Sequence, residues 1–402
     1  MQIRKLLAAS LAAAVLSGSL CTMNVSAAEF EAYPDTAKTT SAKTEVQIKN
    51  LSFYKVSPTK IKLAWSDAKD AQVKTYYLQK YNETTKKWKS IAKANSDGVS
   101  NKRRYAYTET LSSSAPQQYK YRVCVVVRDE SRYKAVSGKS QYASNVKVCL
   151  DPGHFQNKNG GTYGYSEAQA VLRIGTNLSN YLKREGIDVY MTRTDENITV
   201  GGSTNQDDGY QLEARGHMAK NNNCDVFISL HTNANDANAN GCDTIHQPSS
   251  LNKTIVFVNK VAYNQSSKTV IDMANRMGSN VTKKNKELGI PTTNWLSVSN
   301  NGGKPYTYRI SNGYDDFTDY NDGLNKKGKA IFRMLNDGQD YYAVLRAAAN
   351  DGVPGILIEH SFHTVPEFCS KFMNDPDVAK HYALCDARAI GSAFKFKVYT
   401  TI

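Results

Sequence analysis

Short apolar runs alternate with longer amphipathic segments through residues 146–402, and this alternation constrains the fold more than any other feature of the chain. The runs that are typical of buried strands are residues 146–150, 187–192, 225–230 and 355–358. The segments with apolar side chains at helical spacing are residues 167–185, 212–220, 268–284 and 377–394. This order predicts an α/β domain in which helices flank a central, mostly parallel sheet.

Charged or histidine side chains follow three of the predicted strands. The first run leads into Asp151 and His154, the third stops at His231, and the fourth stops at Glu359. Glu167 opens the first predicted helix, directly after a serine of the kind that caps helices. Because ligands of open α/β sheets bind beyond the carboxyl ends of the strands, we expect these side chains to meet there.

These residue types are the parts of a hydrolytic zinc site. Zinc takes imidazole and carboxylate ligands, and three protein ligands leave a fourth position for water. Zinc lowers the pKa of that water to about 7, and a nearby carboxylate can accept its proton. The expected ligands are His154, Glu167 and His231, and the expected general base is Glu359.

Each of these residues also has an ordinary structural explanation when it is taken alone. A histidine at a strand end is more often a hydrogen-bonded polar residue than a ligand. Glu167 suits the first turn of a helix, and Glu359 could be an ion-pair partner. Four such residues at one edge of one sheet favour a site over coincidence. His360 and His363 lie close enough to Glu359 in the sequence to contact substrate or to hold the base.

Several short motifs follow one another in order across residues 146–394. They are Asp151-Pro152-Gly153-His154, Glu167 with Leu172, Thr192-Arg193, Arg215 with Ala219-Lys220-Asn221, Ser229-Leu230-His231-Thr232-Asn233-Ala234, Val344-Leu345-Arg346, and Pro354-Gly355-Ile356-Leu357-Ile358-Glu359 with Phe362. In this order they resemble the zinc-dependent N-acetylmuramoyl-L-alanine amidases of bacterial cell walls.

The resemblance implies a reaction and a set of roles. By position, His154, Glu167 and His231 would hold one Zn²⁺, and Glu359 would be catalytic. The substrate would be peptidoglycan, cut at the amide between the lactyl group of N-acetylmuramic acid and the L-alanine of the stem peptide. The candidates for contacts behind the ligands or with substrate are Asp151, Arg215, Asn233, His360 and His363.

Two other functions fit parts of the pattern. A zinc peptidase that cuts elsewhere in the stem peptide would use the same metal chemistry. A non-catalytic cell-wall-binding protein with an inactive hydrolase fold would be expected to lack a ligand, and the ligand set here is complete.

The sequence departs from the family in ways that concern substrate contacts. Phe155-Gln156 stands in place of the usual Gly-Gly, and the usual Asn a few residues after Glu359 is missing. The insertion at residues 289–340 is long and rich in aromatic side chains, Trp295 and Tyr314 among them. We expect it to form a wall of the substrate cleft, with a separate surface subdomain as the alternative.

Residues 45–145 have the pattern of an all-β module. Ile61-Lys62-Leu63-Ala64-Trp65 alternates at the period of a strand, and further short runs are separated by Pro and Gly. The whole segment resembles a fibronectin type III sandwich. Residues 45–144 contain 20 Lys and Arg against 8 Asp and Glu, a net charge of +12. Such a module suits anionic wall polymers, although a solvated lysine-rich surface or a spacer is the alternative.

The N-terminus has the features of a targeting segment. Residues 1–27 combine Arg4 and Lys5 with an apolar stretch and a small-residue cleavage site, which predicts a secretory signal peptide. Residues 28–44 are predicted to be a disordered leader. Secretion argues against a nucleic-acid partner, and no later segment predicts a membrane span. Buried free thiols are expected at Cys124, Cys149 and Cys224, with pairing of Cys369 and Cys385 left open.

Overall fold

The structure of the protein is a computed structural model. It describes residues 20–22, 51–66, 73–96, 104–129, 132–155, 159–196, 209–235, 247–264, 268–293, 306–308, 317–321, 330–335, 337–396 and 398. The chain divides into two compact units. The first is Met1–Phe53, Lys62–Glu109 and Lys120–Ser140, and the second is Tyr54–Ile61, Thr110–Tyr119 and Gln141–Ile402. The domain boundary expected at residue 145 and the leader expected at residues 28–44 stay predictions.

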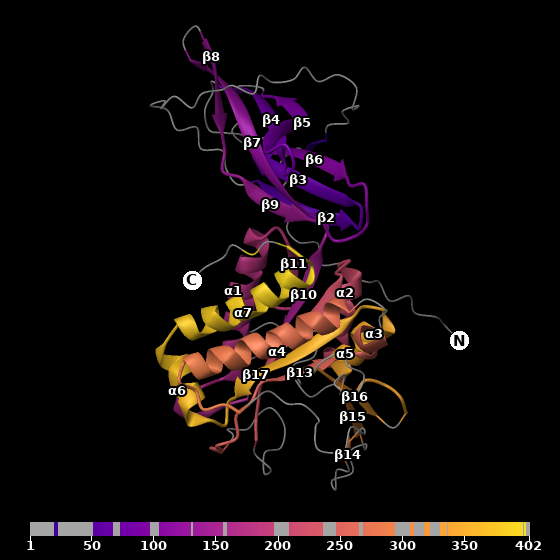
Figure 1. Ribbon diagram of the computed structural model, residues 1–402, viewed down its shortest axis with the longest axis vertical. Helices are drawn as coiled ribbons and strands as arrows, with labels where there is room; N and C mark the ends of the chain where they lie inside the picture. Colours follow the sequence, from indigo (N-terminus) through magenta and orange to yellow (C-terminus); the bar gives the residue numbers. More distant parts are fainter. Residues whose placement is uncertain are drawn as a thin grey trace, which may run out of the picture. The chain divides into compact units, whose positions relative to one another are not determined.

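The first nine strands form two sheets (Figure 1). They are β1 (Leu20–Thr22), β2 (Ser52–Ser57), β3 (Lys60–Ser66), β4 (Val73–Asn82), β5 (Lys87–Asn95), β6 (Arg104–Thr110), β7 (Gln118–Asp129), β8 (Arg132–Ser137) and β9 (Gln141–Ser144). One sheet has the order β1-β6-β3-β2, and the other has the order β5-β4-β7-β8, with β9 also pairing with β7. An all-β module is therefore plausible, while its likeness to fibronectin type III stays a prediction.

Alternation along β3 follows the sequence pattern. Ile61, Leu63 and Trp65 are buried and the residues between them are not, so this strand prediction is confirmed. The Trp65 ring stacks on Tyr105 of β6 with 5.7 Å between centroids. Strand β1 lies inside the segment predicted to be a signal peptide and pairs in parallel with β6; the signal peptide stays a prediction.

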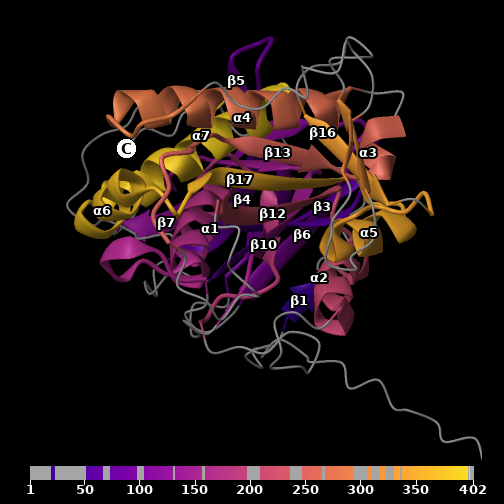
Figure 2. The same ribbon diagram turned by 90° about the horizontal axis from the view of Figure 1, so that it is seen from below.

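The remaining strands form one eight-stranded sheet with the order β11-β10-β12-β17-β13-β16-β15-β14. They are β10 (Lys147–Pro152), β11 (Asp188–Met191), β12 (Val226–Asn233), β13 (Ile255–Val258), β14 (Tyr306–Tyr308), β15 (Phe317–Asn321), β16 (Ile331–Leu335) and β17 (Gly355–Phe362). Figure 2 shows β13, β17, β12 and β10 side by side in that order.

The sheet is mixed rather than uniformly parallel. Neighbours from β11 to β17 pair in parallel, as predicted for this part of the chain. Strand β13 pairs antiparallel with β17 and parallel with β16, and β15 pairs antiparallel with both β14 and β16. A parallel neighbour needs a crossover connection, usually a helix, and none lies between β12 and β13 in the part of the chain that the structure describes.

Helices cover both faces of this sheet. They are α1 (Glu167–Arg184), α2 (Gly209–Asn221), α3 (Lys260–Asn264), α4 (Thr269–Glu287), α5 (Ala343–Asn350), α6 (Pro366–Asn374) and α7 (Asp377–Ala393), with a short 3₁₀ turn at Thr162–Gly164. Helix α7 packs between α1 and α4 in one layer, and α2 packs against α5 in the other. The four helices predicted from periodicity are confirmed within a few residues. None of the described helices is long and apolar enough to cross a membrane.

Helix α1 begins and ends where its sequence signals indicate. The Ser166 hydroxyl caps the first turn by accepting from the Gln169 N–H at 3.5 Å. Gly186 follows the helix at φ +78°, and a Cβ there would lie 2.5 Å from the backbone N of Ala143. Glu167 is therefore fixed at the first position of the helix, where its side chain can reach the end of the sheet.

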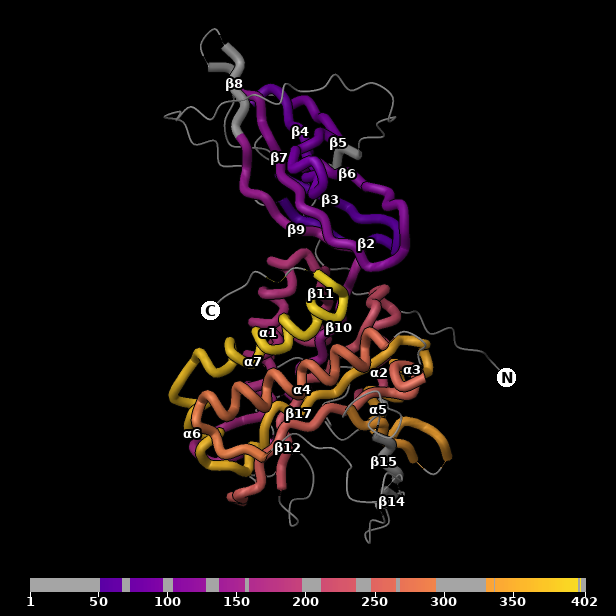
Figure 3. Tube along the Cα trace, viewed as in Figure 1, coloured from indigo at the N-terminus to yellow at the C-terminus, as the bar shows by residue number. Residues whose placement is uncertain are grey.

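Two strands run further than the sequence predicts. The run at 225–230 continues as β12 through His231 to Asn233, and β17 continues through Glu359 to Phe362. The predicted ends at His231 and Glu359 are wrong because ladder pairing between the two strands continues through that pair. The two side chains are thus held by paired backbone, not by loops. Figure 3 shows these strands adjacent although they are far apart in the sequence.

The structure describes part of the insertion and five of the cysteines. The described parts of residues 289–340 contribute β14, β15 and β16 to the sheet, whereas Trp295 and Tyr314 lie outside the described residues. Whether the insertion forms a cleft wall stays a prediction. The five described cysteines are Cys124, Cys149, Cys224, Cys369 and Cys385, all buried and free. Cys369 and Cys385 do not pair, since their thiols face the carbonyls of His363 and Asn280.

Candidate metal centre

The turn after β10 brings His154 to the end of the sheet. The Gly153 N–H donates to the Leu230 carbonyl of β12 at 3.0 Å, which ties the turn to its neighbour strand. A Cβ at Gly153 would lie 2.1 Å from Cε1 of His231, so only glycine fits beside that ring. His154 follows with φ +55°, an unusual conformation for a side chain of this size.

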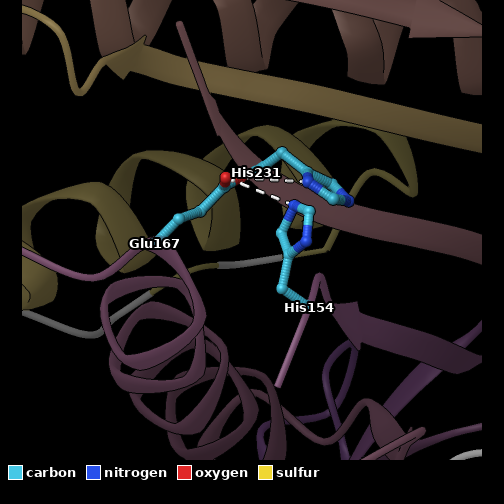
Figure 4. A group of neighbouring side chains, drawn as sticks. All are labelled: His154, Glu167 and His231. Carbon is cyan, nitrogen blue, oxygen red and sulfur yellow. Dashed lines mark hydrogen bonds and ion pairs between the residues drawn. The ribbon is translucent and has the colours of Figure 1, made fainter. Parts of the chain in front are cut away.

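Three side chains from three elements converge beyond this turn (Figure 4). Glu167 Oε2 lies 3.2 Å from His154 Nε2, and Glu167 Oε1 lies 3.0 Å from His231 Nδ1. One ligand atom from each of the three residues lies within 4.8 Å of the other two. The structure brings together all three side chains that the sequence nominates as ligands.

Burial and charge set the protonation of this group. Burial acts to raise the pKa of Glu167, but the charges and hydrogen bonds of His154 and His231 outweigh it and hold that pKa well below its usual range. Burial acts to lower the pKa of His231, and the hydrogen bond and charge of Glu167 raise it instead. The carboxylate is therefore ionised, as a metal ligand must be.

The donor set suits Zn²⁺. Bonds of about 2.0–2.2 Å at tetrahedral angles place ligand atoms roughly 3.3 Å apart. The two contacts of Glu167 with the histidines, 3.0 and 3.2 Å, are close to that spacing. Two imidazoles and one carboxylate are also the ligand types of hydrolytic zinc sites.

Glu359 lies on β17 directly opposite His231 of β12. Its side chain is 8% exposed, and Oε2 has no hydrogen-bond partner among the described residues. Burial raises the pKa of Glu359 to about 7, with Glu167 adding to the rise and His231 opposing it. A carboxyl group with a pKa near neutrality can both accept and return a proton, which is what a general base needs.

A sequence profile of the family described as "N-acetylmuramoyl-L-alanine amidase" matches residues 148–392, more than half of the chain. The chain belongs to this family. A segment of 100 residues is 32% identical to the N-acetylmuramoyl-L-alanine amidase AmiC of Escherichia coli O6:H1, and it covers 24% of this chain and 21% of AmiC. A similar segment is 29% identical to the uncharacterized protein YqiI of Bacillus subtilis, over 25% of this chain and 44% of YqiI. The matched segments thus span less than half of either relative.

Solved structures give weaker likenesses. The CwlD amidase from Clostridioides difficile, in complex with the GerS lipoprotein, matches with a TM-score of 0.40 and 17% identity, over 62% of this chain and 99% of that chain. The catalytic domain of the amidase CwlV from Bacillus (Paenibacillus) polymyxa var. colistinus matches with a TM-score of 0.38 and 16% identity, over 63% and 99%. The family assignment rests on the profile match.

Two buried arginines hold the turn that carries His154. Arg215 of α2 donates to Asp151 Oδ1 at 2.7 Å and to the carbonyls of Pro152 and His154 at 3.1 and 3.2 Å. Arg193, which follows β11, donates to the carbonyls of Pro152 and Gly153, both at 2.8 Å. Asp151 and Arg215, two of the sequence candidates for contacts behind the ligands, therefore support the turn that carries the candidate ligand His154. Arg193 was not among the candidates, although it stands in one of the motifs.

The two histidines that follow Glu359 have different hydrogen-bond partners. His360 is fully buried; its Nε2 lies 2.9 Å from Asp386 Oδ2 of α7, and its Nδ1 lies 3.1 Å from the His231 carbonyl. His363 is also buried, with Nδ1 3.0 Å from Thr232 Oγ1 and 4.0 Å from Glu167 Oε2. Both are therefore buried next to the candidate ligands rather than exposed to solvent.

Asn233 and Asn159 differ in how far the sequence reveals them. The Asn233 side-chain oxygen accepts from the Ala234 N–H at 2.8 Å, and the Asn233 main-chain carbonyl accepts from the His363 N–H at 2.8 Å. Asn159 was missed by the sequence argument. Its Nδ2 donates to Glu167 Oε2 at 2.7 Å and lies 3.1 Å from His154 Nε2. Its φ of +56° suits asparagine, but no motif marked this position.

Proposed function

We propose that the protein is a zinc-dependent amidase of peptidoglycan. It would hydrolyse the amide between the lactyl group of N-acetylmuramic acid and the L-alanine of the stem peptide. The observation that carries this proposal is the convergence of His154, Glu167 and His231 beside Glu359, inside the region matched by the amidase family. Its substrate and its activity are inferred for this chain, since the curated relatives are matched over only part of their length.

The residues of the site divide the work. His154, Glu167 and His231 would hold Zn²⁺, which when bound supplies Lewis-acid polarisation and acidifies water at neutral pH. Glu359 then accepts the proton of the attacking water and hands it to the leaving amine. Glu359 Oε2 has no hydrogen-bond partner among the described residues, so it is free to accept a hydrogen bond from the water.

The surroundings of the site keep these groups in place. Arg215 and Arg193 bind successive carbonyls of the turn that carries His154, so the ring is presented by rigid backbone. The Thr232 N–H donates to Glu167 Oε1 at 2.8 Å, which orients the carboxylate between the two imidazoles. Preorganised groups of this kind lower the reorganisation that the reaction requires.

The same proposal extends to the location of the protein and to its basic segment. Residues 1–27 would direct secretion, and residues 45–145 would hold the enzyme to anionic polymers of the cell wall. The support is the net charge of +12 over residues 45–144, which complements a polyanionic surface.

Digestion of purified peptidoglycan by the zinc-loaded protein, followed by mass analysis of the products, tests this function. We expect free stem peptides that begin with L-alanine, and intact glycan strands. Glu359→Gln keeps the shape of the base without its charge and should release no product, whereas His217→Ala is a matched control. His217 pairs with Asp351 at 2.7 Å on an exposed surface and should leave activity intact. Peptides cut at another bond would make the protein a peptidase.

A further inference from the structure

A β-bulge interrupts the pairing of β12 with β17 at the metal centre. His231 pairs with Glu359, and the next pair is Asn233 with Phe362. Two residues of β17, His360 and Ser361, therefore stand opposite the single residue Thr232. Bulges leave backbone groups outside the ladder and change the direction of nearby side chains, and they are common beside active sites.

The His360 side chain contacts the backbone of His231 at the bulge. Its Nδ1 lies 3.1 Å from the main-chain carbonyl of His231, which can only accept, so Nδ1 must carry the proton and donate it. Its Nε2 lies 2.9 Å from Asp386 Oδ2 of α7, and both side chains are 0% exposed. Asp386 thus fixes the ring that holds the carbonyl of a metal ligand.

Other buried side chains hold the rest of the bulge. The His360 carbonyl accepts from Thr254 Oγ1 at 3.1 Å and from Asn285 Nδ2 at 3.2 Å. The Ser361 hydroxyl and the Phe362 N–H both donate to Asn252 Oδ1, at 2.9 and 2.8 Å. Buried side chains therefore hold the backbone between Glu359 and Phe362 at several points.

Burying the polar His360–Asp386 pair has a desolvation cost. Asp386 Oδ1 is buried and has no hydrogen-bond partner among the described residues. Buried polar pairs of this kind are often no more stabilising than apolar residues of the same volume. Stability alone therefore does not explain the pair, whereas its contact with His231 does.

We propose that His360 and Asp386 are positioning residues for the metal centre. They hold the His231 backbone at the bulge, and through it the spacing between the His231 ring and Glu359. This inference rests on the proposed function, because it assumes that His231 binds Zn²⁺. Neither residue touches the ligand atoms, so each acts through the backbone of His231.

Two substitutions of His360 separate the two hydrogen bonds of its ring. An asparagine amide nitrogen takes the position of Nδ1 and keeps the bond to the His231 carbonyl. A glutamine amide takes the position of Nε2 and keeps only the bond to Asp386. The probe is Zn²⁺ alone, measured by competition with a chelating dye in the whole chain. We expect His360→Asn to keep most of the Zn²⁺ affinity and His360→Gln to weaken it about 10–100-fold.

Asn259→Ala is the control for a general loss of stability. Asn259 is equally buried and bonds Val353 and Gly355 at the other end of β17, with both distances 2.9 Å. It should lower the unfolding temperature without changing Zn²⁺ affinity. Equal affinities for wild type, His360→Asn and His360→Gln would overturn the proposal, and so would an equal loss in the Asn259→Ala control.

A second pair of variants covers the case in which His360→Gln does not fold. Asp386→Asn can still hydrogen-bond the ring and should keep Zn²⁺ affinity, whereas Asp386→Ala cannot and should weaken it. An equal effect of the two would contradict the positioning role. A wild-type chain that binds no Zn²⁺ would instead refute the proposed function, and tight Zn²⁺ binding without peptidoglycan cleavage would leave the positioning role standing.

Discussion

At the scale of single residues, burial of Glu359 affects both the stability of the fold and the pKa that suits this carboxyl group to proton transfer. Its pKa of about 7 lies above the usual 4.5, chiefly because burial disfavours the charged form. The unfolded chain loses this proton near pH 4.5, while the folded metal-free protein keeps it to about pH 7. Glu359 therefore destabilises the fold increasingly as the pH rises between these values, and not at all below them.

Glu359→Gln should remove activity and stabilise the metal-free protein. At pH 8 the gain in unfolding free energy should be on the order of 3 kcal/mol, from a pKa shift of roughly 2.5 units. Urea unfolding of both metal-free proteins from pH 5 to pH 8 measures it. A gap between the two that does not grow with pH would contradict the account.

Gly153→Ala should damage the metal centre through a single methyl group. The new Cβ would lie 2.1 Å from the His231 ring, which must then leave its place beside Glu167. We expect Zn²⁺ affinity to fall at least about tenfold, in the range seen when ligand support is lost. Gly164→Ala is the control. Its φ of +72° strains the backbone of an alanine, but nothing lies within 4 Å of the added Cβ, so no neighbouring side chain has to move. Similar Zn²⁺ affinities for the two variants would count against this geometry.

At the scale of elements, long helices with a periodic apolar pattern can be predicted from the sequence, whereas short helices and strands cannot. The helices α1, α4 and α7 carry long periodic patterns, so their positions could be read directly. Strand β13 is only four residues, and α5 is an alanine-rich segment of eight, so neither has a distinctive period. The predicted ends of β12 and β17 are too early. The apolar pattern stops at the polar side chains His231 and Glu359, but the backbone pairing continues beyond them.

The sequence names the three candidate ligands but not the residues that hold them in place. His154, Glu167 and His231 stand at recognisable motif positions. Asn159 contacts two of them, but it lies in a turn with positive φ, and a turn has no periodic apolar pattern that the sequence could show. The partner of His360 is 26 residues away on α7, and such a contact depends on packing that no local pattern encodes.

The link between α2 and the turn after β10 should be costly to break. Arg215→Met would leave Asp151 fully buried without its cation, although Thr192 and Ser229 still donate to it. We expect a loss of about 3–5 kcal/mol in unfolding free energy. Adding Asp151→Asn should recover part of it, because no buried charge remains. Chemical denaturation of the two variants measures this, and an unchanged midpoint for Arg215→Met would refute the role of the contact.

At the scale of the whole molecule, charge separates the two parts of the chain more clearly than any motif. The net charge is +12 over residues 45–144 but +1 over residues 145–402, where 27 Lys and Arg face 26 Asp and Glu. A neutral enzyme with a basic companion segment is expected to bind an anionic wall through that segment, with an affinity that falls as salt rises.

Neutralising lysines on the basic segment should weaken wall binding. Lys60, Lys89 and Lys93 are exposed, and their joint replacement by Gln should lower the binding of the Glu359→Gln protein to purified walls at low salt. The matched control exchanges Lys183, Lys220 and Lys283, which are exposed on α1, α2 and α4 outside residues 45–144. Sedimentation with walls from low to high salt measures the effect. Equal losses for the two sets would point to charge in general and contradict a dedicated segment.

Zinc dependence is tested by titrating the metal-free protein with Zn²⁺ and measuring the release of stem peptides from peptidoglycan at each addition. We expect activity to rise to a plateau at about one Zn²⁺ per chain, the stoichiometry of a single three-ligand site. His231→Ala should stay inactive through the same titration. Full activity in the protein before any Zn²⁺ is added, or in His231→Ala, would contradict a zinc amidase built on these residues.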